Sequence, residues 1–180
     1  MNTGNIIFWS IFCIIFMTVN GFAIFNSQKH ISYIRSARKV YRTINNISNY
    51  NEGWLIAYLR KIDPYVFEEL ILLAFRKKGY RIKRNKRYTH DGGIDGKVFR
   101  AREKYLIQAK RYGSYISGEH VKQFSEICRK NKCYGYFIHT GKTGSTVRNE
   151  IPENVRIISG KYLYELFIEK EDDVLYFGRT

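Results

Sequence analysis

Two short segments in the middle of the chain carry residue types that could hydrolyse a phosphodiester bond. In Asp91-Gly92-Gly93-Ile94-Asp95 two acids flank a glycine-rich turn, and Gln108-Ala109-Lys110 closes an apolar run. Such hydrolysis needs a divalent cation held by oxygen ligands and a positive charge near the attacking water. The carboxylates of the turn can hold the cation, and Lys110 can supply the charge. The pattern therefore predicts a hydrolytic site in which these two segments meet.

Two neighbouring strands are needed to bring these segments together. Alternation along a strand over residues 104–110 puts Gln108 and Lys110 together on one face. A hairpin partner over residues 94–99 then places Asp95 at its start, beside that polar face. We expect the three side chains to share one end of a sheet.

A helix is predicted ahead of these strands, with Asp63 as its N-cap and Gly79 at its end. Glu68 shares a helical row with apolar residues four and seven positions on, so it should lie at the edge of the buried side. A salt bridge is the commoner role for such an acid, but a place in the site is the alternative. Glu69 is expected to be an ordinary surface acid.

The charge of the chain predicts a polyanionic partner. Lys and Arg number 31 against 16 Asp and Glu, a net charge of +15, and residues 76–87 hold eight of these cations and no acid. Nucleic acid or an anionic membrane surface would attract such a chain, although a run of cations is also typical of a solvated face. The residues predicted to contact DNA are Lys83, Arg84, Lys86, Arg87, Arg111 and Lys142.

Residues 6–25 form an uncharged, mostly apolar run that is long enough to cross a bilayer as a helix. A cleaved signal peptide and a buried core helix are the alternatives, but no Lys or Arg precedes the run and no small-residue cleavage site follows it. Five cations between residues 29 and 42 place the later chain in the cytoplasm by the positive-inside rule, against anionic lipid headgroups. The sequence thus predicts a single-pass anchor in the cytoplasmic (inner) membrane.

Three segments are predicted: a transmembrane anchor over residues 1–26, a basic juxtamembrane connector over 27–62 and a globular domain over 63–180. In the globular domain, short strands alternate with helices, which predicts an α/β fold with a mixed sheet covered on both faces. The expected strands are 80–83, 94–99, 104–110, 134–139 and 155–159, and the expected helices are 63–78, 117–130 and 161–169. Three cysteines make neither a disulfide framework nor a zinc site.

Several of these features together resemble a known family. They are Phe67-Glu68 on a helix that ends in Gly79-Tyr80, the acid-glycine turn 91–95, Gln108-Ala109-Lys110, and the later segments 136–140 and 157–160. From about residue 63 to 167 the chain resembles the Mrr-like catalytic domain, a branch of the PD-(D/E)xK nuclease superfamily found in type IV restriction endonucleases. The resemblance implies a restriction-endonuclease-like fold and a Mg²⁺-dependent endonuclease acting on DNA.

The resemblance also implies roles for individual residues. Asp95 would be the main metal ligand, helped by the backbone carbonyl of Ala109 and by Glu68. Lys110 would orient or polarise the attacking water. Gln108 stands where the wider superfamily has Asp or Glu; this branch shares that departure, and the lost charge predicts weaker Mg²⁺ binding.

Three hypotheses about function follow. The first is a membrane-anchored Mg²⁺-dependent endonuclease that restricts foreign or modified DNA. The alternatives are a membrane-tethered DNA-binding protein without catalysis, for plasmid maintenance or transfer, and a structural membrane protein whose cations contact lipid. Nucleases of this superfamily often pair to cut both strands, so a homodimer is a further expectation, for which the sequence contains no motif.

Overall fold

The computed structural model describes Trp9, Phe12 and residues 28–47, 51–85 and 93–168. The predicted membrane anchor lies outside the described residues, apart from Trp9 and Phe12. Among the residues that are described, no helix is long and apolar enough to cross a bilayer. The anchor therefore stays a prediction.

Five strands form one mixed sheet in the order β1-β2-β3-β4-β5. Their bounds are β1 Arg81–Arg84, β2 Gly96–Arg100, β3 Glu103–Lys110, β4 Tyr134–His139 and β5 Val155–Ile158. β1, β2 and β3 run antiparallel, whereas β3, β4 and β5 run parallel to one another. This sheet confirms the predicted strands to within two residues at each end and confirms the mixed α/β class.

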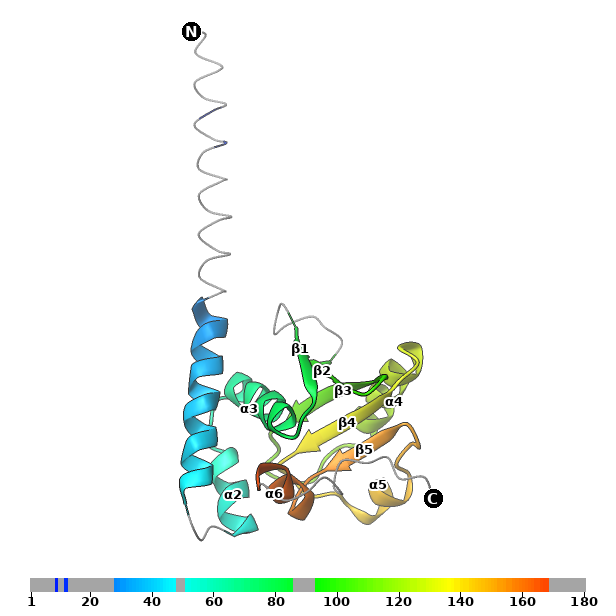
Figure 1. The fold of residues 1–180 in the computed structure, drawn as a ribbon. Helices are drawn as coiled ribbons and strands as arrows, with labels where there is room; N and C mark the ends of the chain where they lie inside the picture. The colour runs from blue at the N-terminus through cyan, green and yellow to red at the C-terminus, as the bar shows by residue number, and fades with distance from the viewer. Residues whose placement is uncertain (1–8, 10–11, 13–27, 48–50, 86–92, 169–180) are drawn as a thin grey trace.

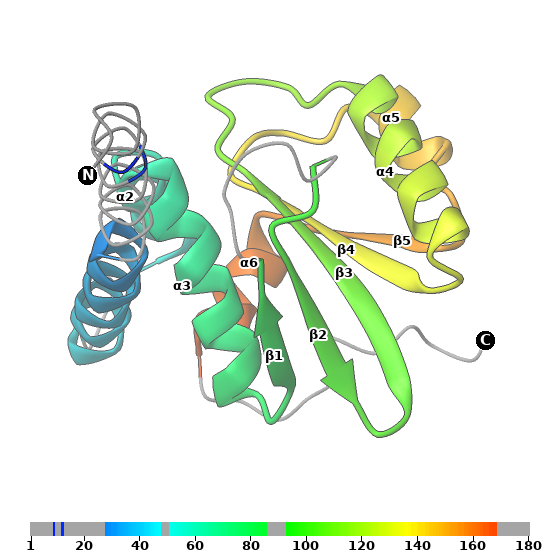
Figure 2. The same ribbon diagram turned by 90° about the horizontal axis from the view of Figure 1, so that it is seen from above.

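Helices cover both faces of the sheet, as Figures 1 and 2 show. The helical segments are residues 28–46, α2 Glu52–Leu59, α3 Pro64–Lys77, α4 Gly118–Lys130, α5 Ser145–Asn149 and α6 Lys161–Phe167. α3 and α6 lie on one face and α4 lies on the other, and the helix over 28–46 lies against α3 on the side away from the sheet. The layers explain why α3 is apolar on most of its surface.

The start of α3 has a local cause in the sequence. The Asp63 carboxylate accepts hydrogen bonds from the backbone N–H groups of Tyr65 and Val66, at 2.8 and 3.2 Å. Pro64 follows at the first helical position, where its missing N–H costs nothing. The helix therefore begins where the sequence predicts, and this start fixes the position of Glu68 one turn later.

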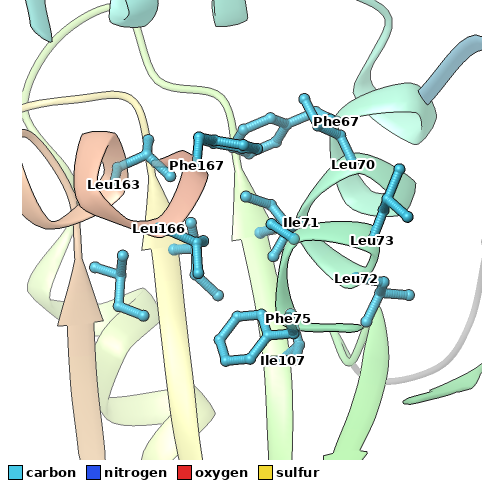
Figure 3. Packing of buried hydrophobic residues seen from close by; sticks show 14 of the residues in the cluster. Phe67, Leu70, Ile71, Leu72, Leu73, Phe75, Ile107, Leu163, Leu166 and Phe167 are labelled. Atoms are coloured by element: carbon cyan, nitrogen blue, oxygen red, sulfur yellow. The ribbon is translucent and has the colours of Figure 1, made fainter. Parts of the chain in front are cut away.

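The main core lies between α3, α6 and the sheet (Figure 3). Phe67, Ile71 and Phe75 from α3 pack there with Leu163 and Phe167 from α6. A second cluster fills the opposite side, between α4 and the sheet; it is formed by Leu106, Ile116, Val121, Phe124, Cys128, Phe137 and Val155. Both faces of β3 are buried, and this burial fixes its register with β2 and with β4.

The segment expected to be a connector belongs to the main core. The helix over residues 28–46 contributes Ala37, Tyr41 and Ile44 to the core, and α2 contributes Leu55 and Leu59. Packing thus continues across residue 63, the predicted start of the globular domain. A fragment without residues 28–46 would expose the apolar surface that this helix covers.

Glu69 is buried, so the prediction that it is a surface acid was wrong. Its side chain is 2% exposed. Its carboxylate lies 2.6 Å from Arg84 Nε and 3.8 Å from His30 Nε2. The periodicity of α3 did not reveal this burial, because the covering groups come from β1 and from the helix over 28–46.

Replacing Arg84 by alanine is expected to lower the free energy of unfolding by about 3–5 kcal/mol, since it removes the charged partner nearest to a buried carboxylate. The neighbouring Lys83 is exposed, and Lys83→Ala should change stability by less than about 0.5 kcal/mol. Chemical denaturation of the two variants measures both values. If Arg84→Ala and Lys83→Ala have the same free energy of unfolding, the Arg84–Glu69 pair does not stabilise the packing of β1 on α3.

Candidate active site

A pocket of about 380 Å³ opens where β3 ends and β2 begins. It is lined by Pro64, Phe67, Glu68, Gly93, Asp95, Gln108, Ala109, Lys110, Arg111, Tyr112 and His120. These residues come from α3, from the turn before β2, from the end of β3 and from the first turn of α4. All five residues predicted to carry the chemistry or hold the metal are among them.

Hydrogen bonds attach Asp95 to the end of β3. Its N–H donates to the Ile107 carbonyl at 2.8 Å, and its Oδ2 accepts from the Ala109 N–H at 2.6 Å. In a strand of an antiparallel pair, the N–H and the C=O of one residue point toward the same neighbouring strand. The Ala109 N–H points toward Asp95, so the Ala109 carbonyl lies on the same side of β3 as the Asp95 carboxylate. Two oxygen donors of different types thus converge at this position.

Gly93 supports the site in two ways. Its φ of +84° is a left-handed conformation that side chains disfavour, and a Cβ here would lie 2.5 Å from Gln108 Nε2. The turn therefore packs directly on the Gln108 amide. Asn85 donates a side-chain hydrogen bond to the Ile94 carbonyl and so closes the chain around the turn. Asp91 lies outside the described residues.

Gln108 and Lys110 point toward α4. Both line a smaller pocket of about 250 Å³ with His120, Gln123 and Phe124 from that helix. Gln108 Oε1 is buried and has no hydrogen-bond partner in the described part of the chain. Over the same residues the structure gives the Lys110 ammonium neither a hydrogen bond nor an ion pair. An acceptor and a cation are thus available inside the cavity.

Glu68 reaches the pocket from α3 and is half-buried, as predicted. Burial, followed by the charges of Asp95, Glu69 and Asp63, raises the pKa of its carboxyl to about 9. Glu68 therefore keeps its proton at neutral pH in the metal-free protein. A cation bound between Glu68 and Asp95 would lower this pKa and favour the ionised carboxylate.

The residues predicted to contact DNA have different environments. Arg111 lines the pocket, and its Nη1 donates to the Arg60 carbonyl at 2.9 Å. Lys142 lies on the loop after β4 and Lys83 on β1, both exposed, and neither lines the pocket. Arg84 is held by Glu69. Lys86 and Arg87 lie outside the described residues, so a continuous basic surface stays a prediction.

Sequence reasoning missed two polar side chains that line the pocket, Tyr112 and His120. The Tyr112 hydroxyl lies 2.6 Å from His120 Nδ1. Burial raises the pKa of the Tyr112 phenol. Tyr112 follows Lys110 by two residues, on the loop after β3, and this closeness along the chain was a usable signal. His120 had no such signal, because its place depends on how α4 packs.

The pocket suits a hard divalent cation. Its possible ligands are the carboxylates of Glu68 and Asp95, the Ala109 carbonyl and Gln108 Oε1, which lacks a hydrogen-bond partner among the described residues; all of them are oxygens. Mg²⁺ prefers such oxygen ligands. Within the described ranges no three His, Cys, Asp or Glu side chains gather as a metal-binding group. A cation here would thus depend on backbone, amide and water oxygens as well as on the two carboxylates.

The mixed sheet and its flanking helices fit a restriction-endonuclease-like α/β fold. Residues 59–167 match the family model Mrr_cat, described as restriction endonuclease. The chain belongs to this family. Comparison with curated proteins and with solved structures gave no match. The family match confirms the resemblance inferred from the sequence, and it supports a nuclease function for the domain.

Proposed function

We propose that the protein is a Mg²⁺-dependent endonuclease that hydrolyses phosphodiester bonds in DNA. The observation that carries this proposal is one pocket lined by Glu68, Asp95, Ala109 and Lys110, whose ammonium has no ion pair or hydrogen bond in the described part of the chain. The family match supports the same chemistry. The net charge of +15 supports a polyanionic substrate.

Each residue has a distinct task in this proposal. Asp95 holds the cation with the Ala109 carbonyl, and Glu68 completes the negative charge around it. Bound Mg²⁺ supplies a Lewis acid for the scissile phosphate and its attacking water. The Lys110 ammonium orients that water and offsets the charge that develops on the phosphate oxygens. Gln108 accepts or donates a hydrogen bond without adding charge, so the site binds Mg²⁺ more weakly than one with a third carboxylate.

The setting of this activity is part of the proposal. The apolar run over residues 6–25 supports a single-pass anchor in the cytoplasmic membrane with the nuclease domain in the cytoplasm. Such a nuclease would meet incoming DNA close to the membrane, which fits restriction of foreign or modified DNA. A homodimer would allow both strands to be cut at one place.

Incubation of the full chain in detergent micelles with supercoiled plasmid tests the proposal. We expect nicked or linear DNA with Mg²⁺ and none with EDTA, on methylated or unmethylated plasmid. Asp95→Ala and Lys110→Ala should bind DNA and leave it intact. Retained DNA binding without cleavage by the intact chain would instead favour the non-catalytic DNA-binding protein.

A further inference from the structure

Two loops beside the pocket are joined into one rigid unit. The loop after β3 and the loop after β4 exchange hydrogen bonds through the Thr140 hydroxyl, which accepts from the Tyr112 N–H at 3.1 Å and donates to the Tyr112 carbonyl at 3.0 Å. The Lys142 N–H donates to the Ser114 carbonyl, and the Ile116 N–H donates to the Lys142 carbonyl, both at 3.0 Å. Four hydrogen bonds thus fix residues 112–116 against the loop after β4.

The approach of these loops leaves no space for a side chain at Gly141. A Cβ there would lie 2.4 Å from the Ser114 carbonyl oxygen and 2.7 Å from Tyr112 Cβ. The contact is with backbone and with the first carbon of a side chain, neither of which can swing away. The backbone that carries Tyr115 is therefore held in one position, although it lies on a loop.

Tyr115 projects from this unit into solvent. Its exposure of 64% is high for an aromatic side chain, and the Lys142 ammonium lies 5.9 Å from the centre of its ring. A parallel backbone bridge pairs the same two residues. An exposed ring beside a cation, both on fixed backbone, is the combination that single-stranded nucleic acid requires: stacking for a base and charge for its phosphate.

The backbone that carries Tyr115 is close to the pocket. Tyr115 follows the pocket residue Tyr112 by three positions, so their Cα atoms are at most about 11 Å apart. That distance corresponds to about three base-pair steps of DNA. A base stacked on Tyr115 would therefore lie within a few nucleotides of a phosphate bound in the pocket.

We propose that Tyr115 and Lys142 form a stacking platform that selects DNA with unpaired bases beside the cleavage site, such as a forked or gapped duplex. This inference rests on the proposed nuclease function and adds a substrate class to it. Inside a paired duplex, neighbouring bases cover both faces of each base, so the ring has no partner there. An unpaired base next to the cut can lie on the ring while Lys142 binds its phosphate.

DNA binding without cleavage tests the platform. The full chain in detergent micelles is titrated, in EDTA, into a fluorescent paired duplex and into the same duplex with a single-stranded fork. The variants are Tyr115→Ala, Tyr115→Phe, which keeps the ring, and Tyr162→Ala, which removes a tyrosine that is 51% exposed on α6. Melting temperatures are measured for each. Quenching of 2-aminopurine in the fork of the intact complex gives a second readout, independent of any variant.

We expect the intact chain to prefer the fork and to quench 2-aminopurine, and Tyr115→Ala to weaken fork binding about tenfold, within the range measured for loss of base stacking. Paired-duplex binding should change less than about twofold, and Tyr115→Phe and Tyr162→Ala should bind like the intact chain. Equal binding of fork and duplex by the intact chain, unquenched 2-aminopurine, or equal losses on both DNAs for Tyr115→Ala would overturn the platform. The proposed nuclease activity is decided separately by the plasmid assay.

Discussion

Replacing Lys110 by methionine is expected to lower the single-turnover rate of DNA cleavage about a thousandfold. Removing one group that stabilises charge in a transition state costs about 10²–10³ in rate, and Lys110 is unpaired among the described residues, so no other interaction shares its charge. Methionine keeps most of the side-chain volume in the pocket. The rate is measured with the chain in excess over a labelled DNA, at saturating Mg²⁺.

Lys104 provides a matched control for Lys110. It lies near the opposite end of β3, outside the pocket, and its ammonium donates to the Asn131 carbonyl at 3.0 Å. Lys104→Met should cut DNA at a rate within about threefold of the intact chain. A Lys110→Met variant that cuts as fast as Lys104→Met would remove Lys110 from the mechanism.

Replacing Glu68 by glutamine should reduce cleavage about a hundredfold and yet stabilise the metal-free protein at pH 8. The pKa of Glu68 is raised from 4.5 to about 9 in the folded chain. Between these two pH values the folded state keeps a proton that the unfolded state has lost, so the free energy of unfolding falls as pH rises. Glutamine cannot ionise and avoids this loss. At pH 8 the gain should be at least about 1 kcal/mol, the equivalent of a single pKa unit.

Denaturant unfolding in EDTA at pH 4 and pH 8 measures this effect. Below the unfolded pKa both forms of residue 68 are neutral, so the two proteins should have nearly the same stability at pH 4. Glu126→Gln is a useful comparison, because it is the same substitution at an exposed position of α4 outside the pocket. If Glu68→Gln has the same effect at both pH values, the buried proton is not at Glu68.

The sequence predicted the parts of the site whose cause is local. The cap at Asp63 places Glu68, the alternation of β3 places Gln108 and Lys110, and the glycine turn places Asp95 at the start of β2. Each of these depends on residues within a few positions along the chain. The family match adds the function class but does not change these positions.

The features that sequence reasoning missed depend on packing between distant segments. Glu69 is buried because Arg84 on β1 and His30 on the helix over 28–46 reach it from other elements. His120 enters the pocket because the first turn of α4 packs beside Gln108 and Lys110. The helix over residues 28–46 completes the core, although its composition indicated only a basic connector. No periodicity within one element carries this information.

The most direct test of the central claim is a titration of Mg²⁺ in a single-turnover cleavage assay, with the intact chain and with Asp95→Asn. Asparagine keeps the shape of the side chain and removes the charge that, in this account, holds the cation. We predict that the intact chain cuts DNA at a rate that rises and saturates with Mg²⁺, while Asp95→Asn binds the DNA and stays uncut at every concentration. Cleavage by Asp95→Asn with the same Mg²⁺ dependence would contradict a metal-assisted nuclease site at the end of β3.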